Sequence, residues 1–327
     1  MSTLDGLSVL VTGGTGSFGK AFVRHVLANY NIKRLVVFSR DELKQFEMAQ
    51  EISHPNLRYF IGDVRDEARL RLALDGIDTI VHAAAMKQVV AAEYNPMECI
   101  KTNVLGAENI INTAIGSNVK KVIALSTDKA VNPINLYGAT KLCSDKLFIA
   151  ANNLTRRGET CFSLVRYGNV IGSRGSVVPV FKEKAKNGVL PITDPRMTRF
   201  WLTIEEGVQF VIRSIDIMHG GEIFVPKIPS MCITDLATAV APDCRQEVIG
   251  IRPGEKLHEI LVQREDASFT YSFDDYFIIK PQIQFWEDDT ILYEGSPGTL
   301  VDPEFEYSSD NNDQWVSIED LRAIVDA

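Results

Sequence analysis

The chain has 327 residues, of which 45% are hydrophobic and 24% are charged, and these values are ordinary for a soluble globular protein. A net charge of −9 without a basic block argues against nucleic-acid and anionic-membrane partners. No apolar run approaches the roughly 20 residues that span a bilayer, and no signal-peptide pattern opens the chain. The five scattered cysteines contain no C-x-x-C pair. We therefore expect a cytoplasmic protein with free thiols.

Strands and helices alternate through the first half of the chain. Strands buried on both faces are predicted from short apolar and β-branched runs at 8–14, 34–40, 57–63, 79–85, 120–127 and 162–169. Helical periodicity appears between them, at 41–52, 98–116 and 136–153 among other places. This alternation predicts an α/β fold built on a Rossmann-like, doubly wound parallel sheet.

The pattern changes near residue 170, where a smaller α/β region begins. Its predicted elements are helices at 178–187, 204–218, 233–241 and 316–325 and strands at 222–226 and 247–251. The last helix has a start signal at Ser317. Residues 264–312 are acidic and aromatic and give no assignment. We expect a nucleotide-binding domain over 1–170 and a substrate-binding lobe, interleaved with it, over 171–327.

A glycine-rich segment, TGGTGSFGK, directly follows the first predicted strand and opens a helix. Gly13, Gly16 and Gly19 stand in G-x-x-G-x-x-G spacing. Glycines so placed let the backbone turn tightly and approach a pyrophosphate at the N-terminus of the helix. Between a strand and a helix, this spacing predicts a dinucleotide site rather than a plain turn.

The end of the second predicted strand indicates which dinucleotide is bound. An NAD enzyme has a carboxylate there for the ribose hydroxyls, whereas this chain has Ser39 and Arg40, with Lys44 one turn later. A guanidinium pairs with a 2′-phosphate that a carboxylate would repel, so we expect NADP. The alternative for Arg40 is a solvated charge at a helix start. Asp63, after the third strand, either accepts from the adenine amino group or caps the next helix.

Tyr137 and Lys141 are four residues apart on one predicted helix, so their side chains share a face. An ammonium near a phenol lowers its pKa, and such a phenol can take the proton of a secondary alcohol as hydride leaves. Thr127, which ends the fifth predicted strand, is placed to position that hydroxyl. Asp128 and Lys129 follow it directly, and an exposed turn pair is their ordinary alternative.

These motifs resemble those of the extended short-chain dehydrogenase/reductase superfamily, and within it the inverting UDP-N-acetylglucosamine 4,6-dehydratases of pseudaminic acid biosynthesis. The resemblance covers nearly the whole chain through TGGTGSFGK, FSRDELKQ, GDVRD, HAAAMKQV, STDKAVNPINLYGATK, VRYGNVIGSRGSVVP, DPRMTRFW, GIRPGEKLHE and SSDNNDQWVSIEDLR. It implies an NADP-dependent lyase that inverts C5 of the sugar.

The resemblance also implies how the catalytic residues divide the reaction. Tyr137 would take the C4 hydroxyl proton as C4 is oxidised. Lys129 would then remove the C5 proton while Asp128 protonates the departing C6 hydroxyl. To act as a base, Lys129 must be partly neutral, which burial or nearby cations such as Lys141 would promote.

Ligand contacts follow from the same resemblance. The cofactor is expected to contact Gly13, Thr15, Gly16, Ser17, Phe18, Gly19, Ser39, Arg40, Lys44, Asp63, Val64, Ala83, Lys87, Tyr137 and Lys141. The substrate, UDP-N-acetylglucosamine, is expected to contact Lys87, Asn169, Val177, Thr193, Arg199, Arg252 and Glu255. Arg196 and the loop 173–179 are further candidates, although each arginine is also an ordinary surface ion-pair partner. Relatives imply a homo-oligomer with a dimer as building block, up to a hexamer.

Three rival functions stay open. A UDP-sugar 4-epimerase would use Tyr137 and Lys141 but would need no acid or base for elimination, so Asp128 and Lys129 argue against it. A dehydratase that retains the C5 configuration would share all four residues. An NADP-sensing protein on the same fold would be expected to lose Tyr137 or Lys141, and both are present. The five histidines show no ligand spacing, so no metal site is expected.

Overall fold

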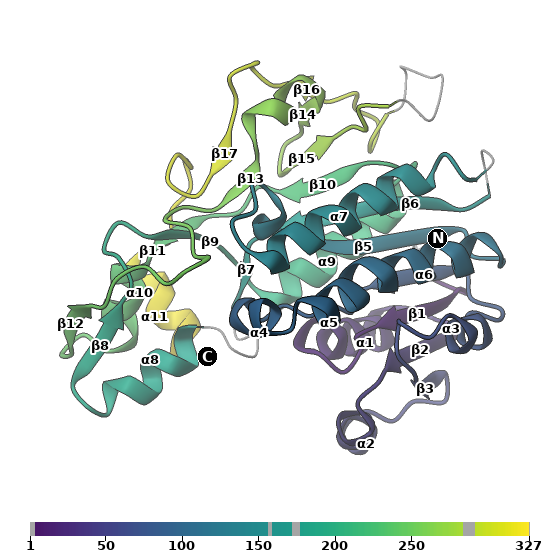
Figure 1. Cartoon of the computed structure of the whole chain (residues 1–327), viewed down its shortest axis with the longest axis horizontal. Coiled ribbons are helices and arrows are strands. Elements are labelled where there is room, and N and C mark those ends of the chain that lie inside the picture. The colour runs from purple at the N-terminus through teal and green to yellow at the C-terminus, as the bar shows by residue number, and fades with distance from the viewer. Residues whose placement is uncertain (1–3, 156–158, 172–176, 284–291, 327) are drawn as a thin grey trace.

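The computed structural model describes residues 4–155, 159–171, 177–283 and 292–326. Among these residues, the centre of the molecule is a ten-stranded sheet in the order β16-β14-β15-β10-β6-β5-β4-β1-β2-β3 (Figure 1). Its strands are β1 Ser8–Thr12, β2 Arg34–Ser39, β3 Leu57–Ile61, β4 Thr79–His82, β5 Lys121–Thr127, β6 Cys161–Tyr167, β10 Ile223–Pro226, β14 Thr270–Ser272, β15 Tyr276–Ile279 and β16 Thr299–Leu300. From β3 to β10 all neighbours are parallel, which confirms the predicted doubly wound sheet.

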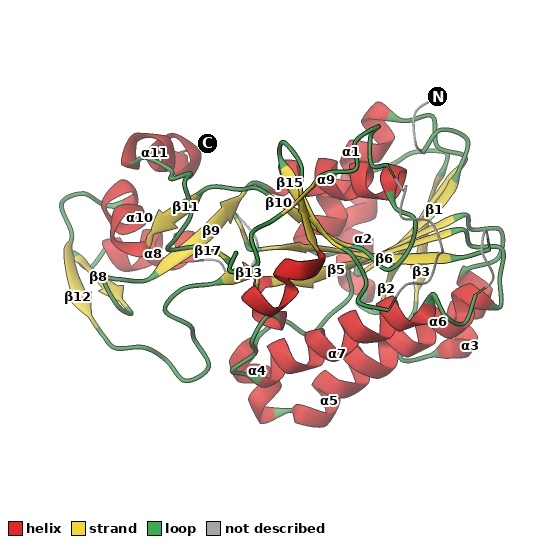
Figure 2. Cartoon of the chain, turned by 90° about the horizontal axis from the view of Figure 1, so that it is seen from above, coloured by secondary structure: helices red, strands yellow, loops and turns green. Residues whose placement is uncertain are grey.

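Helices cover both faces of this sheet. They are α1 Ser17–Asn29, α2 Glu42–Glu51, α3 Glu67–Ala73, α4 Val89–Tyr94, α5 Pro96–Ile100, a π-helix at Lys101–Leu105, α6 Gly106–Ile115, α7 Leu136–Ala151 and α9 Ile204–Ile217. Figure 2 shows α3 to α7 on one face, with α1 and α9 on the other. The buried β-branched strands therefore pack between two helical layers, as a parallel sheet requires.

The helix predicted at 98–116 is continuous but differs in detail. It begins earlier, because Pro96 suits the first turn of a helix, and it contains the π-helical turn. That turn points Asn103 inward, where its side chain accepts from the backbone N–H of Met86 (2.8 Å) and donates to the carbonyl of Met86 (2.9 Å). Hydrogen bonds to both the backbone N–H and the carbonyl of Met86 thus fix the loop that carries Lys87.

A smaller lobe stands beside the sheet, at the left of Figure 1. It contains α8 Val177–Ala185, β8 Val189–Ile192, β9 Thr198–Leu202, β11 Ser230–Cys232, α10 Ile233–Val240, β12 Arg245–Val248 and α11 Ile318–Asp326, and β7 Asn169–Val170 connects it to the sheet. Phe181, Leu190, Trp201, Leu236 and Leu321 belong to a hydrophobic core separate from that of the sheet. Each lobe therefore has its own core, and the cleft between the lobes is lined by residues of both lobes.

The C-terminal half departs most from the sequence analysis. The strand predicted at 247–251 is wrong in its bounds, because β12 pairs with β8 over Arg245–Val248 only. The unassigned stretch 264–312 contains a 3-10 helix at Arg264–Phe269, the strands β14 to β16 and β17 Tyr307–Ser308, and part of it lies outside the described residues. Just before it, β13 Ile260–Val262 pairs with β17. Since β14 and β15 extend the main sheet antiparallel, residues 270–279 belong to the first lobe, although the terminal helix α11 packs in the smaller one.

Two smaller expectations can also be checked. The start signal of the last helix is confirmed, because Ser317 Oγ accepts from the backbone N–H of Asp320 at 3.1 Å. The described part of the chain contains no helix with the length and apolar character needed to cross a membrane.

Candidate active site

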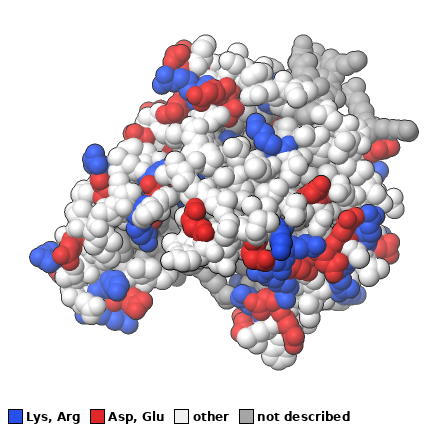
Figure 3. Space-filling view, viewed as in Figure 1, with Lys and Arg blue, Asp and Glu red and all other residues white. Residues whose placement is uncertain are grey.

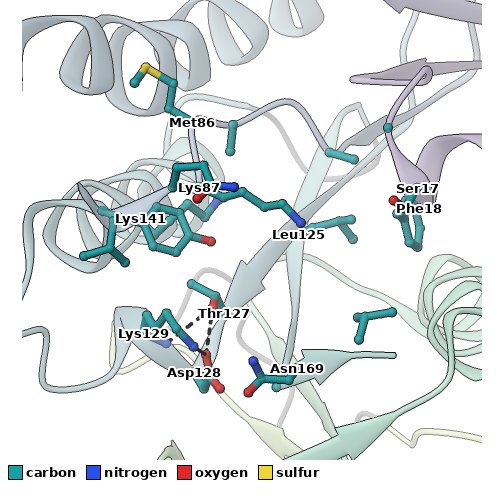
Figure 4. A pocket seen from close by; sticks show the side chains of 18 of the residues that line it. Ser17, Phe18, Met86, Lys87, Leu125, Thr127, Asp128, Lys129, Lys141 and Asn169 are labelled. Atoms are coloured by element: carbon teal, nitrogen blue, oxygen red, sulfur yellow. Dashed lines mark hydrogen bonds and ion pairs between the residues drawn. The ribbon is translucent and has the colours of Figure 1, made fainter. Parts of the chain in front are cut away.

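A cleft of about 940 Å³ lies where the carboxyl ends of β1 to β6 face the smaller lobe (Figure 4). Every residue in the predicted catalytic, cofactor and substrate sets is on its wall, including Val177 and Thr193 from the smaller lobe. Arg196 is not on that wall; it is exposed and pairs with Asp194 at 2.8 Å. The ordinary surface role is therefore the right one for Arg196. The loop candidates at 173–176 lie outside the described residues.

The glycine loop forms a cradle that side chains would fill. Gly13 has φ +64°, and a Cβ on it would lie 2.9 Å from the carbonyl oxygen of Ala83. A Cβ on Gly19 would lie 2.4 Å from the Cα of Gly14, so α1 packs directly on the loop. Gly16 caps α1 without a side chain, and the first turn holds no acidic residue. A dinucleotide pyrophosphate fits this helix N-terminus.

The ribose end of the cradle is formed after β2. Thr15 Oγ1 and Ser39 Oγ are 2.8 Å apart, which ties the glycine loop to this strand end. Asp41 is acidic but faces α2, because it accepts from the backbone N–H of Lys44 (3.0 Å) and pairs with its ammonium (2.6 Å). The guanidinium of Arg40 lines the cleft beside it, so the strand end presents a cation to the ligand.

Asp63 does not cap the following helix, so that alternative is wrong. The cap of α3 is Asp66, whose side chain accepts from the backbone N–H of Arg69 at 3.0 Å. Asp63 instead accepts from Arg65 Nη2 at 2.7 Å and lies 3.7 Å from Arg40. Burial would raise the pKa of Asp63, but the hydrogen bonds from Arg65 outweigh burial and lower this pKa. The carboxylate stays charged on the cleft wall.

Tyr137 and Lys141 lie on α7, and both are buried. The helix is positioned by Asn135, which caps it by accepting from the N–H of Gly138 (2.8 Å) and donates to the carbonyl of Gly254 (2.8 Å). Burial raises the pKa of Tyr137 to about 12, and Lys129 and a hydrogen bond with Thr127 only partly offset it. The expected lowering is therefore wrong for the protein without ligands, because desolvation outweighs the cations.

Asp128 and Lys129 form a 3-10 turn, Asp128–Ala130, directly after β5. Asp128 Oδ1 accepts from Thr127 Oγ1 at 2.9 Å and from Lys129 Nζ at 3.0 Å, as the dashed lines of Figure 4 show. The side chain of Asp128 is only 1% exposed. An exposed turn pair is thus the wrong description of these residues.

The glycine after Tyr137 explains how this turn meets α7. A Cβ on Gly138 would lie 2.1 Å from the carbonyl oxygen of Lys129, far inside contact distance. The backbone of the turn therefore rests on the first turn of the helix, a packing that only glycine allows. As a result the phenol of Tyr137 and the charged pair of the turn face one part of the cleft.

Glu259 is a site residue that the sequence analysis missed. It directly precedes β13, is 2% exposed and places Oε1 3.1 Å from Lys129 Nζ and 3.7 Å from Arg199 Nε. Burial would lower the pKa of Lys129, but Asp128 and Glu259 outweigh burial and raise it. The expected partly neutral Lys129 is wrong for the protein without ligands. The signal in the sequence that could have identified this residue is a glutamate directly before the apolar run ILV.

The other predicted substrate residues are placed by both lobes. Arg199 donates to the carbonyls of Leu257 (3.1 Å) and Lys256 (3.0 Å), so it joins β9 to the loop before β13. Arg252 and Glu255 form an ion pair in that same loop. Asn169 lies next to Asp128 in Figure 4. Burial, helped by the charge of Lys129, lowers the pKa of Lys87.

Five buried polar atoms of the cleft residues have no hydrogen-bond partner within the described chain. They are Thr102 Oγ1, Asp128 Oδ2, Trp201 Nε1, Glu255 Oε2 and Glu259 Oε2. Buried polar groups are nearly always satisfied in native proteins. The cleft therefore has polar groups that a bound ligand or water can satisfy.

A doubly wound dinucleotide cradle, a Tyr-x-x-x-Lys helix after β5 and a second lobe across the cleft define an extended short-chain dehydrogenase/reductase. The comparison with family models gives the particular branch. The polysaccharide biosynthesis protein family matches residues 9–281, and the chain belongs to that family.

Individual relatives agree with this assignment. The chain is 56% identical over 323 residues to the UDP-N-acetylglucosamine 4,6-dehydratase (inverting) of Campylobacter jejuni subsp. jejuni serotype O:2, covering 97% of each chain. It is 45% identical over 280 residues to the UDP-glucose 4-epimerase of Rickettsia conorii, covering 83% of this chain and 82% of that one.

The solved structure of Pen from Bacillus thuringiensis is 36% identical and covers 99% of both chains with a TM-score of 0.88. The dTDP-glucose 4,6-dehydratase DesIV from Streptomyces venezuelae, solved with NAD and TYD bound, has a TM-score of 0.69 at 24% identity. It covers 77% of this chain and 87% of its own, and it shows that the fold is shared.

Proposed function

We propose that the protein is a UDP-N-acetylglucosamine 4,6-dehydratase that inverts C5, giving UDP-2-acetamido-2,6-dideoxy-β-L-arabino-hex-4-ulose. The observation that carries this proposal is the buried turn of Asp128 and Lys129 on the helix of Tyr137. A 4-epimerase needs a phenol and a lysine but no buried acid–base pair beside them. The inverting dehydratase at 56% identity supports the same choice over the epimerase at 45%.

The chain's own residues divide the reaction between two groups. Tyr137 first loses its own proton to solvent, which a cationic ring beside it would favour, and the phenolate then takes the C4 hydroxyl proton, with Thr127 beside it. The 4-keto group then acidifies the C5 proton, which Lys129 removes. Asp128 gives its proton to the leaving C6 oxygen, so that water departs. C5 is later protonated on the opposite face, which inverts it.

The cofactor we propose is NADP. When bound, it would supply a cationic ring close to the buried phenol and a reversible hydride acceptor for C4 and donor for C6. Arg40 would pair with its 2′-phosphate, while the carboxylate of Asp41, which also lines the cleft, is held by the backbone N–H and the ammonium of Lys44. Asp63 is the proposed acceptor for the adenine amino group. Lys141 is buried one turn after Tyr137 on α7; burial lowers its pKa, and the charge of Asp145 opposes this shift.

UDP would lie across the smaller lobe. Arg252 is the exposed half of its ion pair with Glu255, so its guanidinium can turn to a phosphate while the carboxylate turns to ribose hydroxyls. Asn169, Val177 and Thr193 line the path toward the sugar. Lys87 is the proposed contact between the sugar and the nicotinamide end.

We also propose a homo-oligomer in the cytoplasm. Val90, Tyr94, Met97 and Leu105 are exposed apolar side chains on α4, α5 and the π-helix, next to the helix of Tyr137. Figure 3 shows that the middle of this face carries few charges. An exposed apolar patch of this kind marks an interaction surface. All five cysteines are unpaired, which suits a reducing compartment.

A proton NMR time course with UDP-N-acetylglucosamine and catalytic NADP⁺ tests the function. We expect a C6 methyl signal to appear as the sugar disappears. In that product a missing H3–H5 Overhauser contact supports inversion, whereas a contact places the enzyme among the retaining dehydratases. UDP-N-acetylgalactosamine without a methyl signal would establish the epimerase instead. Cofactor binding without any turnover would favour a sensing role.

A further inference from the structure

The proposed dehydratase reaction assigns no role to Glu259, yet Glu259 is one of the most buried charged groups of the cleft. Its residue is 2% exposed, and Oε2 has no hydrogen-bond partner in the described chain. A carboxylate buried in this way costs several kcal/mol unless it is paired. Its partners are Lys129 at 3.1 Å and Arg199 at 3.7 Å, so its position is bound up with that of the lysine.

Lys129 has to act as a base in the proposed elimination, but its neighbours hold it as an ammonium. Among the described residues, the side-chain hydrogen bonds of its Nζ go to Asp128 Oδ1 (3.0 Å) and Glu259 Oε1 (3.1 Å). An ammonium has no lone pair with which to take the C5 proton. Lys129 must therefore lose a proton before it can work as a base, and these two oxygens are its nearest acceptors among the described residues.

Glu259 is better suited to this task than Asp128. Asp128 Oδ1 already accepts from Thr127 Oγ1, and Asp128 has to deliver a proton of its own to the C6 oxygen. Glu259 keeps a whole oxygen unpartnered. Burial raises the pKa of Glu259, so this carboxylate can take up a proton.

We propose that Glu259 accepts the ammonium proton of Lys129 and thereby converts it into the base of the elimination. The inference rests on the proposed dehydratase function and assigns it a positioning residue from a distant part of the chain. In this role Glu259 acts through Lys129 rather than on the sugar or the cofactor.

The proton transfers balance over one turnover. An N–H bond of Lys129 breaks and an O–H bond of Glu259 forms, so an ion pair becomes an amine and a carboxylic acid. The amine takes the C5 proton, the C5–H electrons form the C5–C6 double bond, and the C6–O bond breaks as Asp128 protonates the oxygen. Lys129 then passes a proton to Asp128 and receives one from Glu259, which restores all three groups. Tyr137 releases the C4 hydroxyl proton to solvent, and C5 later takes a proton from solvent on its opposite face, so no proton is gained or lost.

The charged groups around Glu259 come from three elements. The turn after β5 supplies Asp128 and Lys129, β9 supplies Arg199, and the loop before β13 supplies Lys256. Arg199 and Lys256 donate to backbone carbonyls, so they stay in place while the proton moves. Their positive charge, together with that of Lys129, favours the carboxylate form of Glu259, while Asp128 holds the proton that it later gives to the C6 oxygen.

The test is the pH dependence of dehydration in the Glu259→Gln holoenzyme. The amide keeps an oxygen for Lys129 but cannot hold its proton, which must then go to solvent. For the wild type we expect a flat rate of C6 methyl formation between about pH 7 and 9. For the variant we expect a rate about 100-fold lower at pH 7 that rises about tenfold per pH unit, because the amine form of Lys129 becomes commoner. C4 oxidation, followed by the absorbance of reduced nicotinamide, should stay within about twofold.

Glu259→Asp is the matched control, since it keeps a proton acceptor on a shorter side chain. It should be slower than the wild type but keep the flat profile. A Glu259→Gln profile that is parallel to the wild type, or an unchanged rate, would overturn the proposal. If the wild type makes no methyl product, the proposed function fails instead, so the two failures are distinguishable.

A measurement on the wild type serves if Glu259→Gln does not fold. With ¹³C-labelled glutamate, the infrared band of a protonated glutamate carboxyl should rise during turnover and fall when substrate is exhausted. No rise in the labelled band during dehydration would refute proton uptake by a glutamate. The flat profile of Glu259→Asp then has to agree with this result.

Discussion

The two halves of the proposed active site are assembled in different ways. The proposed redox half, Tyr137 and Lys141, lies on one helix and is fixed by four residues of spacing. The elimination half takes Asp128 and Lys129 from the turn after β5 but Glu259 from a segment that is 130 residues away from Lys129. Local geometry thus secures the first half, whereas the second depends on the tertiary fold.

Electrostatics separate the halves as well. In the redox half, burial dominates and raises the pKa of Tyr137 to about 12, so the phenol awaits a cationic ligand. In the elimination half, ion pairs dominate, and the carboxylates outweigh burial at Lys129. The first half is therefore activated by what binds, and the second by moving a proton within the protein.

The largest effect is expected when the redox half is removed. Tyr137→Phe should lower both C4 oxidation and methyl formation by about 10³-fold or more, since no later step can begin. Stopped-flow absorbance of reduced nicotinamide and NMR of the product measure the two. Because Tyr137 is also an expected cofactor contact, NADP binding, followed by fluorescence titration, should weaken, but far less than the two rates. Appreciable C4 oxidation in this variant would show that another group takes the hydroxyl proton.

Removing the base of the elimination should stop the elimination half while the redox half still works. Lys129→Ala is expected to bind NADP and to oxidise C4, yet to form the methyl product about 10²- to 10⁴-fold more slowly. A single-turnover experiment should show reduced nicotinamide accumulating. Normal dehydration by this variant would remove Lys129 from the mechanism.

A smaller change tests the contact between the halves. In Gly138→Ala the new Cβ would meet the carbonyl of Lys129, so the turn must move away from α7. We expect dehydration to fall about 100-fold and stability by about 1–3 kcal/mol, as overpacking predicts. Product NMR and urea unfolding measure these changes.

Gly207→Ala is the matched control for that variant. Gly207 is also a buried helical glycine, but a Cβ there would lie 3.4 Å from its nearest neighbour, the side chain of Leu202. It should keep activity and gain up to about 1 kcal/mol of stability from helix propensity. Equal losses in both variants would mean that the tight packing of Gly138 is not special.

The smallest effect is expected at the ribose end of the cradle, far from both halves. Arg40→Asp should shift the preference from NADP toward NAD by about 10- to 100-fold, because a carboxylate repels the 2′-phosphate. The ratio of kcat/KM for the two cofactors measures it. An unaltered ratio would show that the 2′-phosphate is held elsewhere, for example by Lys44.

The sequence predicts the redox half and the cradle well because each depends on short spacings: glycines after a strand, and a tyrosine four residues before a lysine. It predicts Asp128 and Lys129 only through the family resemblance, since a charged pair after a strand is usually solvated. It does not predict Glu259, because nothing local shows that β13 lies against the turn after β5. The charge states of Tyr137 and Lys129 escape it for the same reason: they depend on burial and distant carboxylates.

The separation of Lys129 and Glu259 also bears on how the protein is made. Their contact closes a loop of 130 residues, whereas the cradle and α7 are complete once the first 151 residues are available. Contacts of such long range form late in folding. On the ribosome, a growing chain would be able to assemble its nucleotide pocket well before its full acid–base set. Competence for elimination would then be acquired last, when Glu259 and β13 have packed against the turn after β5.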